Sequence, residues 1–230
     1  MPASTKKLPK LVAALEALYG RPRPLPASGA LELILWENIA YLADDVRRTQ
    51  AWMQLQERIG TKPEKILAAP RRVLEDIAGA GILASDRAGK LREVAAIALS
   101  EFGGALDAAL DASPEKASRQ LRKFPSIGQP GAEKILLFTR RQRVLALDSN
   151  GLRVLLRLGY GKEQKNYAAS YRSAQEASRP EWKDDFDWLI GAHQLLRRHG
   201  QELCKAKHPR CEACPLRQDC AYYRLFGPGA

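Results

Sequence analysis

Apolar residues recur at intervals of three and four along most of the chain, which is the spacing of one buried helical stripe. The first stripe, over residues 8–18, ends at Gly20, and the prolines that follow exclude a helix. Residues 31–42 are apolar around most of a helix circumference and are predicted to form a central, buried helix. Further helices are expected over 46–59, 70–78, 86–102, 115–124, 131–139, 150–158, 167–177 and 182–199. Because no alternating strand pattern appears, the chain is predicted to be all-α, with about ten short helices.

The composition is that of a folded, basic protein. Hydrophobic residues make up 45% of the 230 positions, enough for one large domain or two small ones. Lys and Arg number 37 against 26 Asp and Glu, and the net charge of +11 suits a polyanionic partner. The longest apolar runs are too short to span a membrane, and no apolar stretch follows the lysines in residues 1–10. Neither membrane insertion nor export is expected.

All four cysteines fall in one C-terminal segment, residues 204–220, with six, two and five residues between them. A disulfide framework would spread its cysteines over distant parts of the chain, so this crowding predicts a metal centre instead. Four thiolates can hold iron or zinc. A zinc ribbon usually has two Cys-x-x-Cys pairs, and only Cys211 and Cys214 form one here. The spacing favours an iron–sulfur cluster, with zinc as the alternative.

Residues 121–136 have the pattern of a helix, a tight turn and a second helix. Pro125 ends the first helix, and Pro130 falls in the first turn of the second, where it gives up no useful hydrogen bond. The backbone N–H groups from Ser126 through Gly128 to Gly131 are expected to be exposed and to bind a DNA phosphate. An ordinary corner between two helices needs much the same residues, so this pattern alone leaves both interpretations open.

One carboxylate, Asp148, stands directly before the apolar helix expected over 150–158. An aspartate in this place is typical of a helix N-cap, whose side chain accepts a hydrogen bond from a backbone N–H group. From the local pattern alone, a capping role is the simplest interpretation.

Three motifs together resemble the helix-hairpin-helix (HhH-GPD) DNA glycosylases, the superfamily of endonuclease III and MutY. They are the hairpin sequence at 124–128, the Asp-Ser-Asn at 148–150, and the segment 191–200 followed by cysteines in the superfamily's spacing. Ser126 replaces a glycine that is usual in the hairpin. The resemblance extends over roughly residues 28–223, nearly the whole chain.

This resemblance assigns roles to the cysteine loop. It implies a [4Fe–4S] cluster with four ligands, Cys204, Cys211, Cys214 and Cys220. It also implies that basic residues of the loop hold DNA phosphates, here Lys205, Lys207, Arg210 and Arg217. With a net charge of +11, a merely solvated basic face is the alternative for these side chains.

The resemblance also makes Asp148 the expected catalytic residue. Cleavage of an N-glycosidic bond builds positive charge on the deoxyribose as the base departs, and a carboxylate stabilises that charge and orients the attacking water. The base must first be rotated out of the duplex into a pocket.

The chain departs from the superfamily at the residue that cleaves the DNA strand. Bifunctional members have a nucleophilic lysine two residues after the last glycine of the hairpin, and Pro130 occupies that position here. A proline nitrogen within the chain cannot act as an amine nucleophile. Lys134 lies one helical turn further on, where a lysine is more often solvated or bound to phosphate. A glycosylase without lyase activity is therefore expected, and a glycosylase/lyase that uses Lys134 is the alternative.

The expected base pocket also departs from the superfamily, since the buried helix lacks the usual Gln. Its residues Trp36, Asn38 and Tyr41 are candidate pocket residues, as is Pro130, although Tyr41 equally fits a core position. Glu37 and Asn38 are polar residues in an apolar helix, so they are expected either to face a cavity or to satisfy buried backbone groups. Glu37 lies near the place where MutY keeps a catalytic glutamate, and a structural Glu–Arg pair is the alternative.

Ile82 and Leu83, in a Gly-rich loop, are candidates for the apolar wedge that replaces the extruded nucleotide, although isolated apolar residues in a loop usually only pack.

The expected architecture is two helical lobes with a DNA groove between them. One lobe is expected over residues 28–140, and the other joins 1–27 to 141–230, with Asp148 where the lobes meet. The expected function is base-excision repair on double-stranded DNA with a damaged or mismatched base, by a monomer in the cytoplasm, associated with the nucleoid. A DNA-structure-binding protein without catalytic activity is the alternative from another class.

Overall fold

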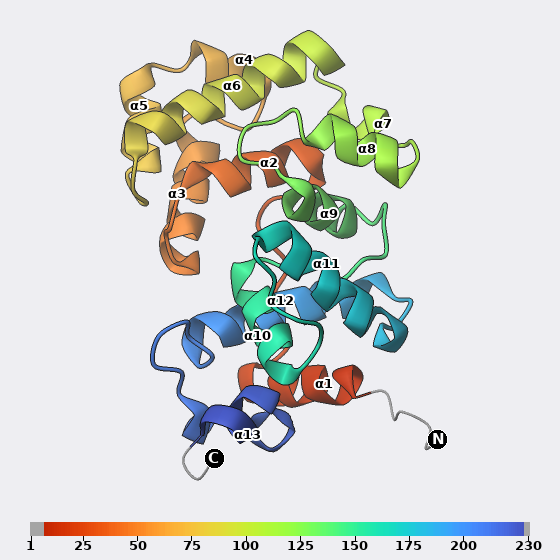
Figure 1. The fold of residues 1–230 in the computed structure, drawn as a ribbon. Helices are drawn as coiled ribbons and strands as arrows, with labels where there is room; N and C mark the ends of the chain where they lie inside the picture. Colours follow the sequence, from red (N-terminus) through yellow and green to blue (C-terminus); the bar gives the residue numbers. More distant parts are fainter. Residues whose placement is uncertain (1–6, 228–230) are drawn as a thin grey trace. The chain divides into compact units, whose positions relative to one another are not determined.

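The computed structural model describes residues 7–227, and all regular elements in this part of the chain are helices (Figure 1). The prediction of an all-α fold is confirmed. Within the described residues, the only β-type pairing is an isolated antiparallel bridge between Tyr41 and Ile82. None of the described helices is long and apolar enough to cross a membrane. Part of the N-terminal segment in which no export signal was expected, residues 1–6, lies outside the described residues.

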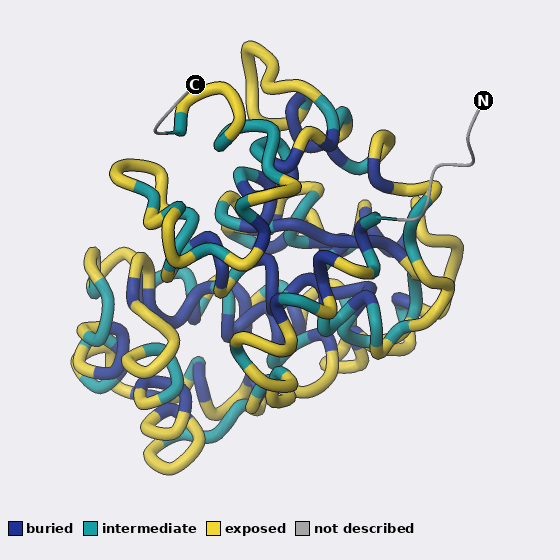
Figure 2. Tube along the Cα trace, turned by 90° about the horizontal axis from the view of Figure 1, so that it is seen from below, coloured by how far each residue is buried: buried dark blue, intermediate teal, exposed yellow. Residues whose placement is uncertain are grey.

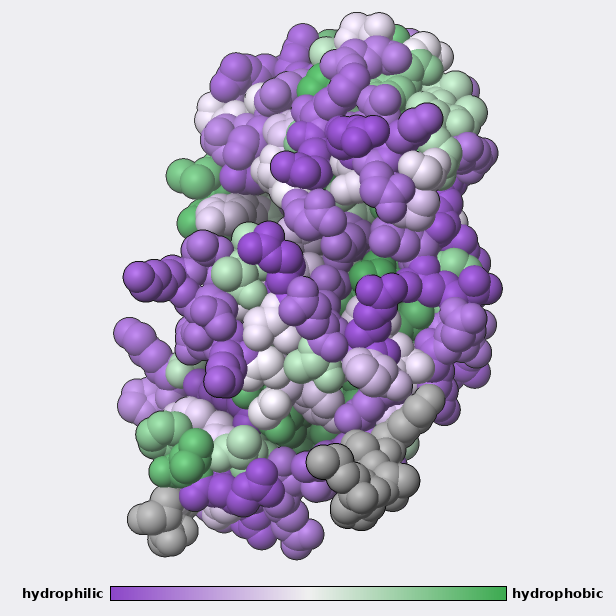
Figure 3. All heavy atoms as spheres, turned by 45° about the vertical axis from the view of Figure 1, so that its right-hand side comes forward, coloured by the Kyte–Doolittle hydropathy of each residue, from purple (hydrophilic) through white to green (hydrophobic). Residues whose placement is uncertain are grey.

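The chain forms two compact units, which are described separately below. The hairpin unit comprises residues 24–142, and the cluster unit comprises the described residues 7–23 and 143–227. In both units buried segments alternate along the chain with exposed turns (Figure 2). Figure 3 shows a face of the molecule on which hydrophilic residues predominate, as the basic composition leads one to expect.

The hairpin unit is built around α2 (Gly29–Ile39), whose buried side chains lie on all sides of the helix. This agrees with the apolar circumference read from the sequence. The helix packs against α3 (Asp45–Arg58), α6 (Ala84–Phe102), α7 (Leu106–Ala109) and α9 (Gln129–Phe138). Two further helices, α4 (Pro63–Ala68) and α5 (Arg71–Ala78), pack on α6. The result is one continuous apolar core.

The helix–turn–helix predicted around residue 128 is present as α8 (Pro114–Leu121), a turn, and α9. Ser113 caps α8 by accepting a hydrogen bond from the N–H of Lys116, as its Ser-Pro-Glu sequence indicates. Gly128 is the N-cap residue of α9, and Pro130 lies in the first turn. The first N–H groups of any helix lack partners within it, so this helix start can offer donors to an anion.

The cluster unit is centred on α12 (Phe186–Glu202), against which α1 (Leu8–Tyr19) and α10 (Ser149–Leu158) pack. The unit is completed by α11 (Tyr167–Ser178), which packs on α10, and by α13 (Ala221–Phe226) at the end of the described chain. Two histidines of α12 are buried. His193 Nδ1 is 2.7 Å from the carbonyl oxygen of Ala146, which fixes the segment that leads into α10.

Several helix boundaries differ from the predicted ones, for reasons of capping. The helix expected over 182–199 begins at Phe186, because Asp185 accepts hydrogen bonds from the N–H groups of Asp187 and Trp188, and it continues to Glu202. The helices α4, α7 and α13 were not predicted, since four to six residues are too few to establish a period.

Candidate active site and cluster site

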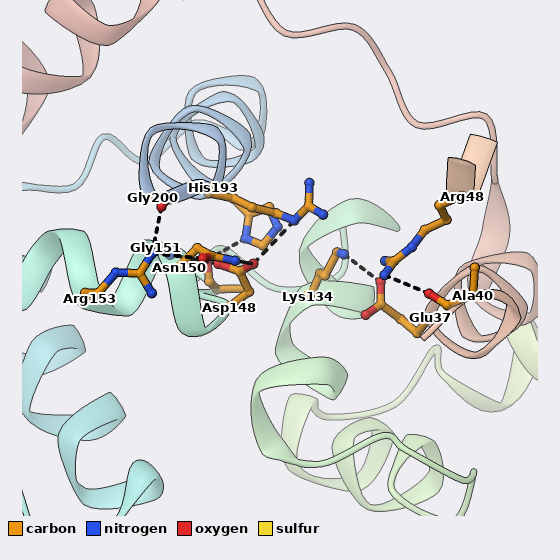
Figure 4. A network of polar contacts seen from close by, with 12 residues as sticks. Glu37, Ala40, Arg48, Lys134, Asp148, Asn150, Gly151, Arg153, His193 and Gly200 are labelled. Atoms are coloured by element: carbon orange, nitrogen blue, oxygen red, sulfur yellow. Dashed lines mark hydrogen bonds and ion pairs between the residues drawn. The ribbon is translucent and has the colours of Figure 1, made fainter. Parts of the chain in front are cut away.

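Asp148 is the N-cap residue of α10, and both of its carboxylate oxygens are engaged (Figure 4). Oδ1 accepts a hydrogen bond from the N–H of Gly151 at 2.8 Å, and Oδ2 accepts one from the side chain of Asn150 at 3.1 Å. The side chain is 28% exposed and also lies 3.3 Å from Arg197 Nε. The capping interpretation is therefore confirmed, but the carboxylate is open enough to meet a substrate as well.

A second arginine holds the surroundings of Asp148 in place. Arg153 Nη2 donates to Asn150 Oδ1 at 2.9 Å and to the carbonyl oxygen of Gly200 at 2.7 Å (Figure 4), and its Nε donates to the carbonyl oxygen of Cys204 at 2.9 Å. Burial lowers the pKa of the Arg153 guanidinium. One side chain thus joins the start of α10, the end of α12 and the cysteine loop.

The approach of α10 to α12 depends on a glycine. A Cβ atom on Gly200 would lie 2.7 Å from Cβ of Asn150, which is closer than two carbon atoms can approach without displacement. Only a residue without a side chain therefore fits at this crossing.

Two residues near Asp148 were not predicted from the sequence. Arg197 reaches Asp148 from α12, and Tyr167 lies close enough at the start of α11 for the negative charge of Asp148 to act on it. Burial and, secondarily, this charge raise the pKa of Tyr167 to about 12. Both residues lie in other segments of the sequence than Asp148, and no local sequence motif indicates that they are near it.

In the hairpin unit, Glu37 of α2 and Lys134 of α9 form an ion pair (Figure 4). The distance from Lys134 Nζ to Glu37 Oε1 is 2.6 Å, and the two side chains are only 11% and 24% exposed, respectively. The structural interpretation of Glu37 as half of an ion pair thus gains support, with Lys134 as a partner. Both candidate catalytic residues of this unit are engaged with each other.

Two of the candidate pocket residues lie in the core, and for Asn38 the alternative role, hydrogen bonding to buried backbone groups, is the one observed. Trp36 is 4% exposed and packs edge-on against Trp52 with ring centroids 5.9 Å apart. Asn38 is fully buried, and its side-chain amide donates to the carbonyl oxygens of Ile34 and Pro125, at 3.0 Å each. The bond to Pro125 joins α2 to the hairpin turn. Because α2 is buried on all sides, the amide of Asn38 finds its partners within the protein.

The hairpin turn is held by a buried arginine. Ser126, which replaces the usual glycine, has a left-handed backbone with φ of 63°. Its hydroxyl accepts a hydrogen bond from Arg87 Nη1 at 3.2 Å, and the Arg87 guanidinium carbon lies 4.5 Å from the ring centroid of Tyr41. Arg87 is 6% exposed, so this contact is sheltered from water. Arg87 thereby contacts both the strained Ser126 and the exposed Tyr41.

The predicted wedge residues are exposed. Ile82 and Leu83 have 52% and 57% of their surface open to solvent. The N–H of Ile82 donates to the carbonyl oxygen of Tyr41 at 3.0 Å, and a Cβ on Gly81 would meet the Tyr41 backbone at 2.5 Å. Two apolar side chains are therefore presented to solvent by a loop that is pinned close to Tyr41.

The four cysteines of the 204–220 loop are free thiols that line one cavity of about 400 Å³, part of it open to solvent. Within residues 7–227, no three His, Cys, Asp or Glu side chains converge on the position of a single metal ion. The cysteines instead surround a shared space, as the ligands of a cluster with several iron atoms do.

Polar groups of the cluster unit point at two of these sulfur atoms. Arg157 Nη1 is 3.3 Å from Cys204 Sγ, and His199 Nε2 is 3.4 Å from Cys214 Sγ. Burial raises the pKa of Cys214 to about 11 and lowers the pKa of His199 to about 4. A buried thiolate here needs nearby positive charge, which bound iron supplies.

The basic residues of the loop lie in different surroundings. Lys205, Lys207 and Arg210 are exposed, as phosphate contacts need to be, and Arg210 also lines the cysteine cavity. Arg217 forms an ion pair with Glu212 at 2.7 Å. Lys205, Lys207 and Arg210 are thus the members of this set that are most available to DNA.

Comparisons with known proteins agree with this site. Residues 204–220 match the family model described as the iron–sulfur binding domain of endonuclease III. Endonuclease III of Rickettsia conorii is 25% identical over 222 residues, which cover 93% of this chain and 97% of the relative. Endonuclease III of Thermotoga maritima is 25% identical over 216 residues, covering 94% of each chain. Endonuclease III of Sulfolobus acidocaldarius is 28% identical over 175 residues, covering 75% of this chain and 73% of the relative.

Solved structures show the same fold. A trapped endonuclease III–DNA covalent intermediate matches with a TM-score of 0.73 and 20% identity, covering 96% of this chain and 98% of the other. A thermostable thymine-DNA glycosylase matches with a TM-score of 0.71 and 16% identity, covering 97% and 99%.

The helical fold is thus that of the solved endonuclease III structures, and the cysteine loop matches the iron–sulfur binding domain of endonuclease III. By these similarities the chain is endonuclease III-like. Its cofactor is a [4Fe–4S] cluster, and the residues that would hold it are the four cysteines of the matched segment, Cys204, Cys211, Cys214 and Cys220.

Proposed function

We propose that this chain is a base-excision-repair DNA glycosylase that hydrolyses the N-glycosidic bond of a damaged or mismatched base in double-stranded DNA. The observation that carries the proposal is the state of Asp148. Its carboxylate is held in one orientation by Gly151, Asn150 and Arg197, and it remains 28% exposed. A fixed carboxylate with an open side is suited to stabilise positive charge on a sugar.

In the proposed reaction, the bond from the sugar to the base breaks and the electron pair leaves with the base. The carboxylate of Asp148 stabilises the resulting cationic sugar and orients a water molecule, whose oxygen forms the new bond to the sugar carbon as its proton passes to that carboxylate. The departed base takes up a proton from solvent. Because Asp148 is already oriented by its hydrogen bonds, little reorganisation is needed as charge develops. The base must leave the duplex before this step.

The remaining exposed groups support binding of duplex DNA. The start of α9 at Gly128, together with Gly131 in its first turn, offers backbone N–H groups for a phosphate. Lys205 and Lys207 offer charge for further phosphates, and the net charge of +11 favours association with a polyanion. Ile82 and Leu83, both exposed, are suited to enter the base stack, and the exposed Tyr41 is suited to stack on a base.

The proposed activity is hydrolysis without strand cleavage. Pro130 has no amine to offer at the position where lyases carry their lysine, and Lys134 is paired with Glu37. An amine that attacks a sugar must be neutral and accessible. The alternative is a glycosylase with lyase activity through Lys134. The similarity to proteins named endonuclease III supports this alternative.

The test is a panel of duplexes, each with one damaged or mismatched base, in which base release is detected by alkaline strand cleavage. We expect release from at least one duplex by the wild-type protein and loss of release in Asp148→Asn with DNA binding retained. Asp184→Asn is the matched control, because Asp184 is an exposed aspartate of the same unit, paired with Arg143. Release that persists in Asp148→Asn would overturn the mechanism. Binding without release from any duplex would indicate a DNA-structure-binding protein.

Lyase activity is tested separately by borohydride trapping on DNA that contains an abasic site. A Schiff-base enzyme becomes covalently attached, whereas the proposed hydrolytic enzyme does not. A covalent adduct that disappears in Lys134→Ala would establish the alternative. We further propose that the protein acts as a monomer in the cytoplasm, in association with the nucleoid.

A further inference from the structure

A line of hydrogen-bonding groups leads from the N-terminal helix to one cluster ligand. Tyr19, the last residue of α1, has its hydroxyl 3.0 Å from His199 Nδ1, and His199 Nε2 lies 3.4 Å from Cys214 Sγ. The imidazole is 1% exposed. All three residues belong to the cluster unit, so these distances lie within one compact body.

The chemistry of the ligand fixes the direction of these hydrogen bonds. A thiolate bound to iron has no proton and can only accept. The atom that faces it, His199 Nε2, must therefore carry the proton and donate. In the neutral imidazole Nδ1 is then an acceptor, and the hydroxyl of Tyr19 is its donor. Each group in the line donates toward the sulfur.

The first member of the line is itself held in position. Arg198 Nη1 donates to the carbonyl oxygen of Tyr19 at 3.0 Å, and its guanidinium carbon lies 4.7 Å from the centroid of the tyrosine ring. The rings of Tyr19 and His199 meet edge to face with centroids 6.0 Å apart. The end of α1 is thus fixed against α12 at the point where the hydroxyl reaches the histidine.

We propose that Tyr19 and His199 are positioning residues that donate a hydrogen bond to the cluster ligand Cys214 and thereby raise the reduction potential of the cluster. A hydrogen bond to a ligating sulfur withdraws electron density from it, which favours the more reduced form of the cluster. Tyr19 acts through His199, because its hydrogen bond selects the tautomer that has its proton on the side of the sulfur.

The experiment is protein-film voltammetry on the purified protein with its cluster, compared between the wild type and four single variants. For His199→Leu, which removes the donor, we expect the equilibrium constant for one-electron reduction to fall about tenfold, equivalent to about 59 mV. Tyr19→Phe keeps the ring and removes only the hydroxyl, so a smaller shift in the same direction is expected. His199→Gln retains an N–H donor and should recover most of the wild-type potential.

Tyr160→Phe is the matched control, because it removes a partly buried hydroxyl of the same unit that donates to Glu181. Its potential should equal that of the wild type. The inference is overturned if Tyr19→Phe leaves the potential unchanged and His199→Gln behaves no differently from His199→Leu. If His199→Leu binds no cluster, the potentials of Tyr19→Phe and His199→Gln provide the test. An equal shift of the potential in Tyr19→Phe and in Tyr160→Phe would also overturn the inference.

An independent measurement detects the proton itself. In the wild type, electron–nuclear double resonance on the reduced cluster should show a proton that is coupled to the cluster and exchanges with deuterium, contributed by His199 Nε2. This signal should be absent in His199→Leu and present in Tyr160→Phe. An unchanged set of exchangeable couplings in His199→Leu would mean that no such hydrogen bond exists. Neither measurement depends on which base the protein removes.

Discussion

Lys134 Nζ and Glu37 Oε1 lie 2.6 Å apart and join the middle of α9 to α2 in a largely buried ion pair. Lys134 is the residue that the sequence offers as a substitute for the lyase lysine missing at position 130, and this pair engages it. Breaking a buried ion pair destabilises a protein, because removal of one charge leaves the other buried without an opposite charge. Lys134 is therefore both the candidate lyase residue and a contributor to the stability of the hairpin unit.

Substitution of either partner should reduce stability without creating or removing a covalent DNA adduct. We expect Lys134→Met and Glu37→Gln each to lower the free energy of unfolding by about 1–3 kcal/mol, since each leaves a buried group without its partner. The double variant should lose less than the sum of the two. Urea unfolding and borohydride trapping on the same samples measure both quantities.

The exposed pair between Lys123 and Glu101 in the same unit is the control, with side chains 45% and 40% exposed. Lys123→Met should change the free energy of unfolding by less than about 1 kcal/mol, because solvent screens the pair. Equal losses at the two pairs would contradict the assigned role of Lys134 and Glu37.

The contact between Arg87 and Ser126 should hold a strained turn. Arg87→Met removes the hydrogen bond to Ser126 and the contact with Tyr41, and we expect a loss of about 2 kcal/mol in the free energy of unfolding. Ser126→Gly removes the same hydrogen bond but relieves the left-handed backbone, which costs about 1 kcal/mol for a residue with a side chain. Its net effect should therefore be small.

The two substitutions are expected to be non-additive, which denaturant titration of the double variant tests. Arg87→Met should cost less in the Ser126→Gly background than in the wild type, since the bond it breaks is already absent there. Arg71→Met is the control, because Arg71 donates to Ser85 in an exposed position. Strict additivity of Arg87→Met and Ser126→Gly would show that the arginine does not act through the serine.

Loss of the cluster should loosen one part of the cluster unit only. In Cys214→Ser the iron content should fall, and amide hydrogen exchange in residues 203–227 should rise at least tenfold, because the short elements there have few buried residues of their own. Exchange in α2 and α6 should be unchanged, because these helices belong to the hairpin unit. Ser118→Ala, a substitution in the hairpin unit, provides the comparison, and a global rise in exchange would contradict the expectation.

The lysines of the cysteine loop should contribute to the salt dependence of DNA binding. Each phosphate contact that is removed lowers the slope of log affinity against log salt concentration by about one. We expect this change for Lys205→Ala and for Lys207→Ala, measured by fluorescence anisotropy at several salt concentrations. Lys10→Ala, an exposed lysine of α1, should leave the slope unchanged. A slope that is the same in all variants would remove both lysines from the interface.

Much of the fold could be predicted because its signals are local. The apolar circumference of residues 31–42 predicted a buried helix, and the hairpin residues predicted the start of α9. The cysteine spacing indicated a cluster because all four ligands lie in one segment, which the comparisons bear out.

The roles that the sequence left open, or did not indicate, depend on direction in space. The sequence shows that Asn38 is a polar residue in an apolar helix, but whether its side chain faces a pocket or a backbone carbonyl depends on where the hairpin turn lies. The contacts of Arg197 with Asp148 and of Arg87 with Ser126 likewise join segments about 40 or more positions apart. Such pairings arise from packing, which no local period encodes.

The close crossing of α10 and α12 at Gly200 has a consequence for how the proposed chemistry can be altered. A single methyl group at this position would press on Asn150, which shares a hydrogen bond with the carboxylate two residues before it. The orientation of the Asp148 carboxylate thus depends on free space beside a neighbouring helix, so that a substitution which changes no charge is expected to disturb it.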